Sequence, residues 1–214
     1  MTGALGRLVD HDPRSLDYAA PRTPKVESVE WLRRSPILDQ GDVGACVGFT
    51  AADWLATDSK TRVGRADVTN TLGLKIYSEA TRLDRFKGVY PPDDTGTAGL
   101  YGAKAMVKLG LTTGTYRHAF GLQHLLEALQ TGPVMLGIAW KTGCDTPAKD
   151  GLIRWTGDVR GGHEVSVRGC DVDQARVLID NHWTAQWGVH GSCYLPFEDL
   201  DAALQAKGDV TVPS

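Results

Sequence analysis

Residues 40–49 read QGDVGACVGF and lead into an apolar run that ends at Ala56. Apolar residues of this run recur at the spacing of one helical face: Cys46, Phe49, Ala52 and Leu55. The pattern predicts a buried helix over residues 45–56 with Cys46 in its first turn. N–H groups at a helix N-terminus favour the reactive thiolate and can hold a developing oxyanion. Taken alone, this feature still fits a structural buried cysteine better than a nucleophile.

Gln40 lies six positions before Cys46, across a turn that contains Gly41 and Gly44. From there its side-chain amide can donate a hydrogen bond to the same oxyanion as the Cys46 N–H. The alternative is an ordinary surface-loop glutamine. Gln40 is therefore a candidate oxyanion donor only if a general base exists elsewhere in the chain.

A candidate base follows far downstream, where residues 161–167 read GGHEVSV. After two glycines, His163 at the start of a strand can place its ring at a cleft, and a catalytic cysteine needs such a base. Residues 180–183 read DNHW, so Asn181 can orient the imidazole and Trp183 can shield that hydrogen bond from water. A structural turn asparagine explains Asn181 equally well before the order of the motifs is considered.

The first half of the chain predicts helices and the second half predicts strands. Helical spacing continues over residues 72–83, 99–109 and 122–130, followed by Gly and Gly-Pro stop signals. Short segments rich in Val, Ile and Trp predict strands at residues 134–139, 151–155, 163–170 and 176–180, before a last helix at 198–206. We therefore predict an α+β protein with a helical lobe packed against a β lobe.

Composition argues against several function classes. The 214 residues are 42% hydrophobic and 23% charged, and the net charge of -3 comes from interleaved acidic and basic residues, so we expect no nucleic-acid partner. No apolar stretch approaches the roughly 18 residues that a membrane helix needs, so we expect no membrane partner. The first 16 residues lack the apolar core of a signal peptide, which predicts cytoplasmic synthesis.

The four cysteines show neither a CxxC pair nor metal-ligand spacing, so we expect no metal site and no cofactor. They are Cys46, Cys144, Cys170 and Cys193. Cys170 and Cys193 lie in strand-like segments and can meet in space, but small buried hydrophobes are the better explanation of both.

Together these residues resemble the papain-like (C1) cysteine peptidases over about residues 29–200. VEW at 29–31 is similar to the family's Val-Asp-Trp, and 40–49 to its Gln-Gly-x-Cys-Gly-Ser-Cys-Trp-Ala-Phe. GHEV at 162–165 is similar to the family's Gly-His-Ala-Val strand. NHW at 181–183, followed by Trp187-Gly188, is similar to its Asn-Ser-Trp-Gly-x-x-Trp-Gly. Val43 replaces a disulfide cysteine of the secreted members, which indicates a bacterial or phage-like subgroup.

The resemblance implies one papain-like domain over residues 1–214, with an arm at 1–28, a helical lobe at about 29–130 and an antiparallel β lobe at about 131–214. It implies that peptide or protein substrates are cleaved through a thioester by Cys46, His163, Asn181 and Gln40. Substrate contacts are expected at Gly96, Thr97, Gly162 and Trp183. The arm is short for the family's inhibitory pro-segment, so we expect no large one.

Besides Val43, further positions depart from the family pattern. Val47 replaces the family's Trp, Glu164 replaces Ala and Thr184 replaces Gly. Strand alternation should point the Glu164 side chain away from the His163 ring. Two alternatives to a peptidase stay open. One is a peptidoglycan or isopeptide amide hydrolase with the same site, and the other is a catalytically weak papain-like protein that binds peptides or serves as a structural partner.

Overall fold

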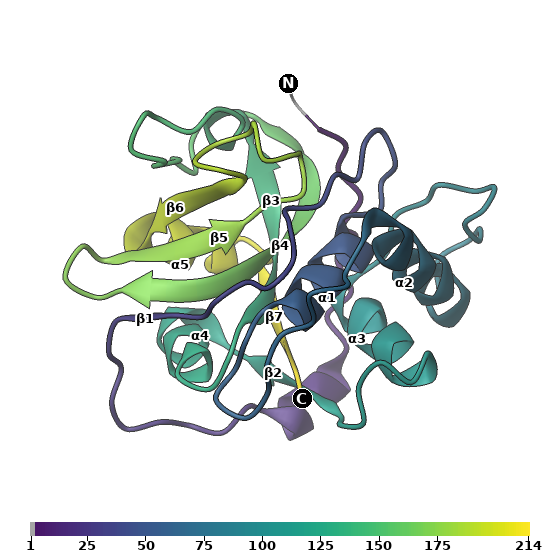
Figure 1. Ribbon diagram of the computed structural model, residues 1–214, viewed down its shortest axis with the longest axis horizontal. Helices are drawn as coiled ribbons and strands as arrows, with labels where there is room; N and C mark the ends of the chain where they lie inside the picture. Colours follow the sequence, from purple (N-terminus) through teal and green to yellow (C-terminus); the bar gives the residue numbers. More distant parts are fainter. Residues whose placement is uncertain (1–2) are drawn as a thin grey trace.

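A computed structural model describes residues 3–214 of the chain (Figure 1). Three helices gather on one side of the molecule: α1 (Cys46–Ala56), α2 (Asn70–Leu83) and α3 (Gly99–Lys108). A twisted β-sheet lies on the other side, and the N-terminal segment runs between the two (Figure 1). Within the described residues, no helix is long and apolar enough to cross a membrane.

The sheet is antiparallel, and its strands follow the order β2-β7-β3-β4-β5-β6, with β1 also paired to β4. The strands are β1 (Val29–Glu30), β2 (Tyr116–Ala119), β3 (Val134–Lys141), β4 (Val159–Asp171), β5 (Arg176–Asp180), β6 (Ser192–Pro196) and β7 (Asp209–Pro213). Short 3₁₀ turns cover Pro13–Tyr18 and Thr142–Cys144. Strand β4 pairs with β1, β3 and β5 and holds the centre of the sheet.

Two hydrophobic cores stabilise the molecule, one under the sheet and one among the helices. The sheet core includes Ile138, Trp140 and Val165, and the helices α4 (Gly121–Leu129) and α5 (Phe197–Gln205) contribute to it. Leu125 and Leu129 of α4 belong to this sheet core, although the sequence-based boundary near residue 130 assigns that helix to the helical lobe. The amphipathic pattern shows that α4 buries one face but not which core receives it.

Helix α1 is the centre of the helical core, and all eleven of its residues are buried. Its close contact with α2 depends on glycine, because a Cβ at Gly48 would lie 2.4 Å from the carbonyl oxygen of Gly73. Val47, on the same helix, packs against Gly102 of α3, where a Cβ would lie 2.8 Å from Val47 Cγ1. Small residues therefore bring both neighbouring helices onto the helix that begins at Cys46.

The predicted strand at residues 151–155 is wrong. This stretch is a loop that begins at Gly151 with φ of +82° and touches β6 only through an isolated bridge between Leu152 and Tyr194. Conversely, the short strands β1, β2, β6 and β7 were not predicted. Strands of five residues or fewer offer few positions to show alternation, and of these only β5 was expected. The predicted helices all form, with ends within two residues of those expected.

Candidate active site

Cys46 opens α1, and its side chain is fully buried where the helix packs against β4. Burial raises the pKa of the Cys46 thiol to about 12, although the neighbouring backbone of Glu164 and Gly6 opposes that rise. The thiol is therefore protonated in this arrangement. The predicted position of Cys46 in the first turn of a buried helix is confirmed.

His163 lies in β4 and meets Asn181 just after the end of β5. Nε2 of His163 is 2.9 Å from Oδ1 of Asn181, and the same oxygen accepts the His182 backbone N–H at 2.9 Å. Because this oxygen is an acceptor only, Nε2 carries the ring proton and Nδ1 is the basic nitrogen. Among the described residues Nδ1 has no hydrogen-bond partner, so the imidazole has one free proton acceptor.

Aromatic rings enclose the imidazole. Trp183 stacks on His163 with ring centroids 4.9 Å apart and 27° between the planes, and Trp140 meets it edge-on at 4.8 Å. Burial, followed by the nearby His182 ring, holds the pKa of His163 well below its usual range. Thr184, directly after Trp183, has φ of +69°, the left-handed region that favours glycine. The chain therefore keeps the turn behind the stacked tryptophan without the glycine of the family pattern.

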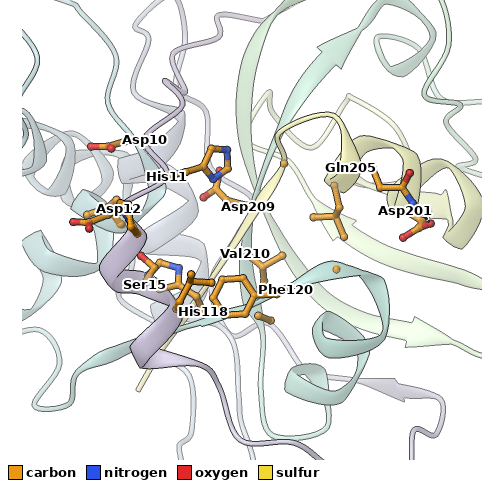
Figure 2. Close-up of a pocket in the computed structure, with 17 residues that line it drawn as sticks. Asp10, His11, Asp12, Ser15, His118, Phe120, Asp201, Gln205, Asp209 and Val210 are labelled. Atoms are coloured by element: carbon orange, nitrogen blue, oxygen red, sulfur yellow. Dashed lines mark hydrogen bonds between the residues drawn. The ribbon is translucent and has the colours of Figure 1, made fainter.

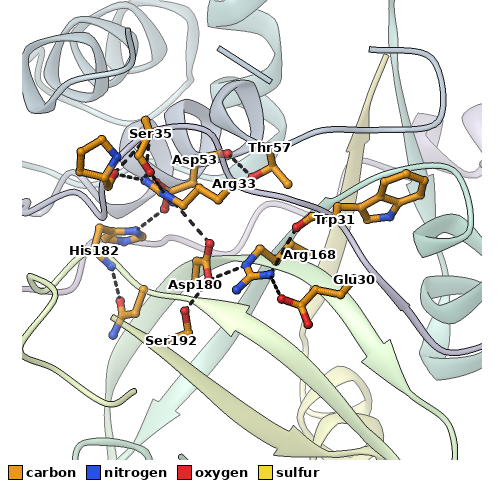
Figure 3. A network of polar contacts seen from close by, with 12 residues as sticks. Glu30, Trp31, Arg33, Ser35, Asp53, Thr57, Arg168, Asp180, His182 and Ser192 are labelled. Carbon is orange, nitrogen blue, oxygen red and sulfur yellow. Dashed lines mark hydrogen bonds and ion pairs between the residues drawn. The ribbon is translucent and has the colours of Figure 1, made fainter. Parts of the chain in front are cut away.

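A buried polar network ties α1 to the sheet beside this histidine (Figure 3). Asp53 of α1 pairs with Arg33 at 2.8 Å and lies 3.3 Å from Nδ1 of His182. Asp180 in turn pairs with Arg168 at 2.9 Å and with Arg33 at 3.5 Å. The sequence did not predict this network, because its charges carry no local motif. It anchors the strand end that holds Asn181.

Gln40 is 3% exposed, which contradicts the surface-loop alternative. Its backbone N–H donates to the carbonyl of His182 at 3.0 Å, so the turn before Cys46 is held against the β side of the site. Nε2 of Gln40 donates to the Val43 carbonyl at 2.7 Å. An amide nitrogen has two hydrogens, so one remains for a second acceptor.

The N-terminal segment fills the space in front of the cysteine, which the sequence did not predict. The backbone N–H groups of Gly6 and Arg7 both donate to the Gly162 carbonyl, at 3.2 and 3.0 Å. The Gly6 carbonyl accepts the Thr97 N–H at 2.9 Å, and the Leu8 N–H donates to the Thr97 carbonyl at 2.8 Å. Residues 3–8, called the cleft segment below, thus hydrogen bond to both sides of the site.

Each residue expected to bind substrate contacts the cleft segment. Gly162 and Thr97 make the hydrogen bonds just described, and Trp183 Nε1 donates to the Ala4 carbonyl at 3.3 Å. Gly96 has φ of +72°, and a Cβ there would lie 2.2 Å from the Gly6 carbonyl oxygen. The structure therefore brings these four residues together around an extended peptide, here one supplied by the chain itself.

The arm was expected to hold no large inhibitory pro-segment, and the six residues of the cleft segment nevertheless cover the site. Gly6 approaches so closely that a Cβ would lie 1.8 Å from the Gly44 carbonyl oxygen. Short Gly-containing arms carry no helical or strand periodicity, so sequence patterns do not identify such contacts. All four cysteines are free, so Cys170 and Cys193 do not pair.

A cavity of about 600 Å³ lies apart from Cys46 (Figure 2). Figure 2 shows Asp10, His11 and Asp12 of the arm on one side of it, with Asp209 and Val210 of β7 behind them. Neither Cys46 nor His163 lines this cavity. The candidate chemistry is therefore in the covered cleft and not in this cavity.

Solved structures with the same fold are cysteine proteases. Xylellain, a cysteine protease from Xylella fastidiosa, matches with a TM-score of 0.72 at 17% identity, over 98% of this chain and 95% of that one. Procathepsin L 3 of the Tenebrio molitor larval midgut matches with a TM-score of 0.64 at 14% identity, over 99% of this chain and 75% of that one. The Carica candamarcensis cysteine protease CMS1MS2 matches with a TM-score of 0.61 at 15% identity, over 87% of this chain and 97% of that one.

No protein-family model and no curated relative matches the sequence. At the identities of the solved structures, the likeness establishes the fold. The chain has the papain-like fold, and the predicted α+β class with a helical lobe against an antiparallel β lobe is confirmed.

Proposed function

We propose that this protein is a cysteine peptidase, with Cys46 as nucleophile and His163 as general base. The observation that carries the proposal is the hydrogen bond of 2.9 Å between His163 Nε2 and Asn181 Oδ1. It leaves Nδ1 as the free acceptor on a ring whose neighbour in β4, Glu164, has its backbone close to the Cys46 thiol. A base with a defined tautomer beside a thiol at a helix N-terminus is the arrangement that thiol catalysis needs.

The proposed reaction begins when a substrate replaces the cleft segment. His163 Nδ1 takes the proton of the Cys46 thiol, and the thiolate attacks the peptide carbonyl carbon. The oxyanion accepts hydrogen bonds from the Cys46 N–H and from Nε2 of Gln40. The imidazolium then protonates the leaving amine, which departs from a thioester, and His163 activates the water that hydrolyses it. Asn181 keeps the imidazole in one orientation throughout.

Alkylation of Cys46 tests the proposal directly. Iodoacetamide is added between about pH 4 and 9 to an Arg7→Ala background and to its His163→Ala and Cys46→Ala variants, and intact mass is followed. The Arg7→Ala change removes an ion pair between Arg7 and Asp209 and is expected to loosen the cleft segment. We expect one fast modification that persists at low pH, is lost without Cys46, and slows without His163. Hydrolysis of a denatured protein should disappear in Cys46→Ala and persist in Cys193→Ala, a matched buried cysteine. Full hydrolysis in Cys46→Ala would refute the scheme.

A peptide-binding protein without catalysis is the second candidate. It is supported by the buried state of both groups, since burial raises the pKa of Cys46 and lowers that of His163. This candidate predicts that the thiol titrates near about 8.5 once the segment is loosened, whether or not His163 is present. The alkylation profile above separates the two candidates.

A further inference from the structure

Arg7 of the cleft segment inserts its side chain into the protein. Only 2% of that side chain is exposed, although it comes from an arm that otherwise follows the surface. Its Nη2 donates to a carboxylate oxygen of Asp209, at the start of β7, and to the Lys207 carbonyl at 2.9 Å. A guanidinium buried this far from its own sequence neighbours marks a site that is built to receive it.

The opposite wall of this site is Glu164. Its carboxylate is fully buried, and neither oxygen has a hydrogen-bond partner among residues 3–214. Its side chain faces Gly99 and Gly137, away from the groups that enclose the His163 ring, as strand alternation predicts. Burial, followed by the charge of Asp209, raises the pKa of Glu164 well above its usual range, and Arg7 opposes that rise.

Glycine makes the room between the two carboxylates. A Cβ at Gly137 would lie 2.6 Å from Arg7 Nε, 2.6 Å from Glu164 Oε2 and 2.8 Å from Asp209 Oδ1. A Cβ at Gly99 would lie 2.3 Å from Glu164 Oε1. Gly99, Gly137, Glu164 and Asp209 therefore form a narrow acidic pocket, called the acidic pocket below. Any larger residue at position 137 would fill the space that the guanidinium now occupies.

The acidic pocket lies one residue from the candidate reacting position. Gly6 lies against the turn that leads into Cys46, where a Cβ on it would be 1.8 Å from the Gly44 carbonyl oxygen, and Arg7 is the next residue of the same extended segment. On the protein side, His163 and Glu164 are also adjacent, so the base and the pocket wall alternate along β4. A peptide bound in the cleft would thus direct one side chain into the pocket while its neighbouring backbone meets the sulfur.

A fully buried carboxylate at Glu164 beside the partly exposed carboxylate of Asp209 is unfavourable without a cation, since burial removes hydration and the two charges repel one another. The Arg7 guanidinium pairs with Asp209 and brings its positive charge to the pocket that Glu164 lines, although the Glu164 oxygens accept no hydrogen bond from it. A neutral side chain of the same length would leave Asp209 without this ion pair. The pocket therefore discriminates by charge more than by size.

We propose that the acidic pocket selects an arginine side chain in the substrate, next to the residue that reacts, and that Arg7 occupies this specificity pocket from within the chain. This inference rests on the proposed peptidase function and names its substrate class: peptides with a basic residue adjacent to the cleaved position. Glu164 and Asp209 are the specificity-determining residues, and Lys, a more compact charge, is the weaker substrate.

A peptide series tests the proposal on the chain of residues 1–214. Fluorogenic peptide amides carry arginine, citrulline or leucine at the second residue before the scissile bond, and a second series carries them at the first. Citrulline has the shape of arginine without its charge. We expect kcat/KM to favour arginine over citrulline by at least about tenfold in one series, a discrimination of about 1.4 kcal/mol. Equal rates for arginine and citrulline in both series would overturn the inference.

Charge-removing variants locate the discrimination. In the Arg7→Ala background, Glu164→Gln and Asp209→Asn should each lower the ratio of arginine to citrulline rates at least threefold. Asp173→Asn, an exposed carboxylate in the turn between β4 and β5, should leave the ratio unchanged. An unchanged ratio in both pocket variants would overturn the assignment, and if they fail to fold, the comparison of arginine with citrulline in the natural chain decides alone. Failure to cleave any peptide, with a Cys46 that alkylates like an ordinary thiol, would instead refute the peptidase function and with it this inference.

Discussion

Replacing Arg7 with alanine should open the candidate active site. Two interactions of its guanidinium hold the cleft segment in place, the ion pair with Asp209 and the hydrogen bond of 2.9 Å to the Lys207 carbonyl. The side chain is 2% exposed, so solvent screens these contacts little. Removing one partner of a buried ion pair costs about 3 kcal/mol at the lower end of measured values. This corresponds to roughly a hundredfold rise in the ratio of open to closed molecules.

The assay is the initial rate at which iodoacetamide modifies Cys46 near neutral pH, with intact mass as the readout. We expect Arg7→Ala to react on the order of a hundredfold faster than the natural chain, or to reach the rate of a fully open site. Arg14→Ala is the matched control, because Arg14 lies on the same arm, is 81% exposed at its side chain, and pairs only with nearby Asp12. Equal rates for the natural chain, Arg7→Ala and Arg14→Ala would refute the view that Arg7 holds the segment closed.

Further expectations concern the network, the base and its orienting amide. Asp53→Asn should lower the free energy of unfolding in urea by about 3 kcal/mol, because it breaks a buried ion pair with Arg33. The control is Asp67→Asn at an exposed ion pair, which should change the free energy of unfolding by less than about 1 kcal/mol. Similar effects of both variants would contradict a stabilising network. Because burial lowers the pKa of His163 in the folded state, the unfolded chain binds the extra proton, and His163 destabilises the fold as pH falls below 6.5. His163→Gln should therefore flatten the loss of stability between pH 6.5 and 5 by up to about 1.4 kcal/mol per pH unit, and parallel curves would contradict a buried neutral imidazole. Asn181→Ala should lower kcat by about tenfold to a hundredfold, less than Cys46→Ala, because Asn181 orients the base without reacting. An unchanged kcat would remove Asn181 from the site.

Local patterns in the sequence predicted much of this protein. Helical spacing identified α1 to α5, because each of these helices turns one apolar face to a core, or lies wholly within one, over at least two turns. The alternation of β4 predicted that Glu164 would point away from the His163 ring. The order of Gln40, Cys46, His163 and Asn181 along the chain, together with the resemblance of their motifs to a known family, predicts one shared site, which is the site proposed above. All these inferences use residues that are close in sequence or a family pattern of short motifs.

Contacts between distant segments were decided only by the tertiary structure. Arg7 meets Asp209 across 202 positions, and no periodicity or motif relates an arginine of a short arm to the first residue of a short strand. The pairing depends on two glycines that leave space, on a burial that makes lone carboxylates costly, and on an arm that reaches the cleft. Sequence patterns report which face a residue presents within its own element. Which residue fills the space beside that face is determined by how the elements pack.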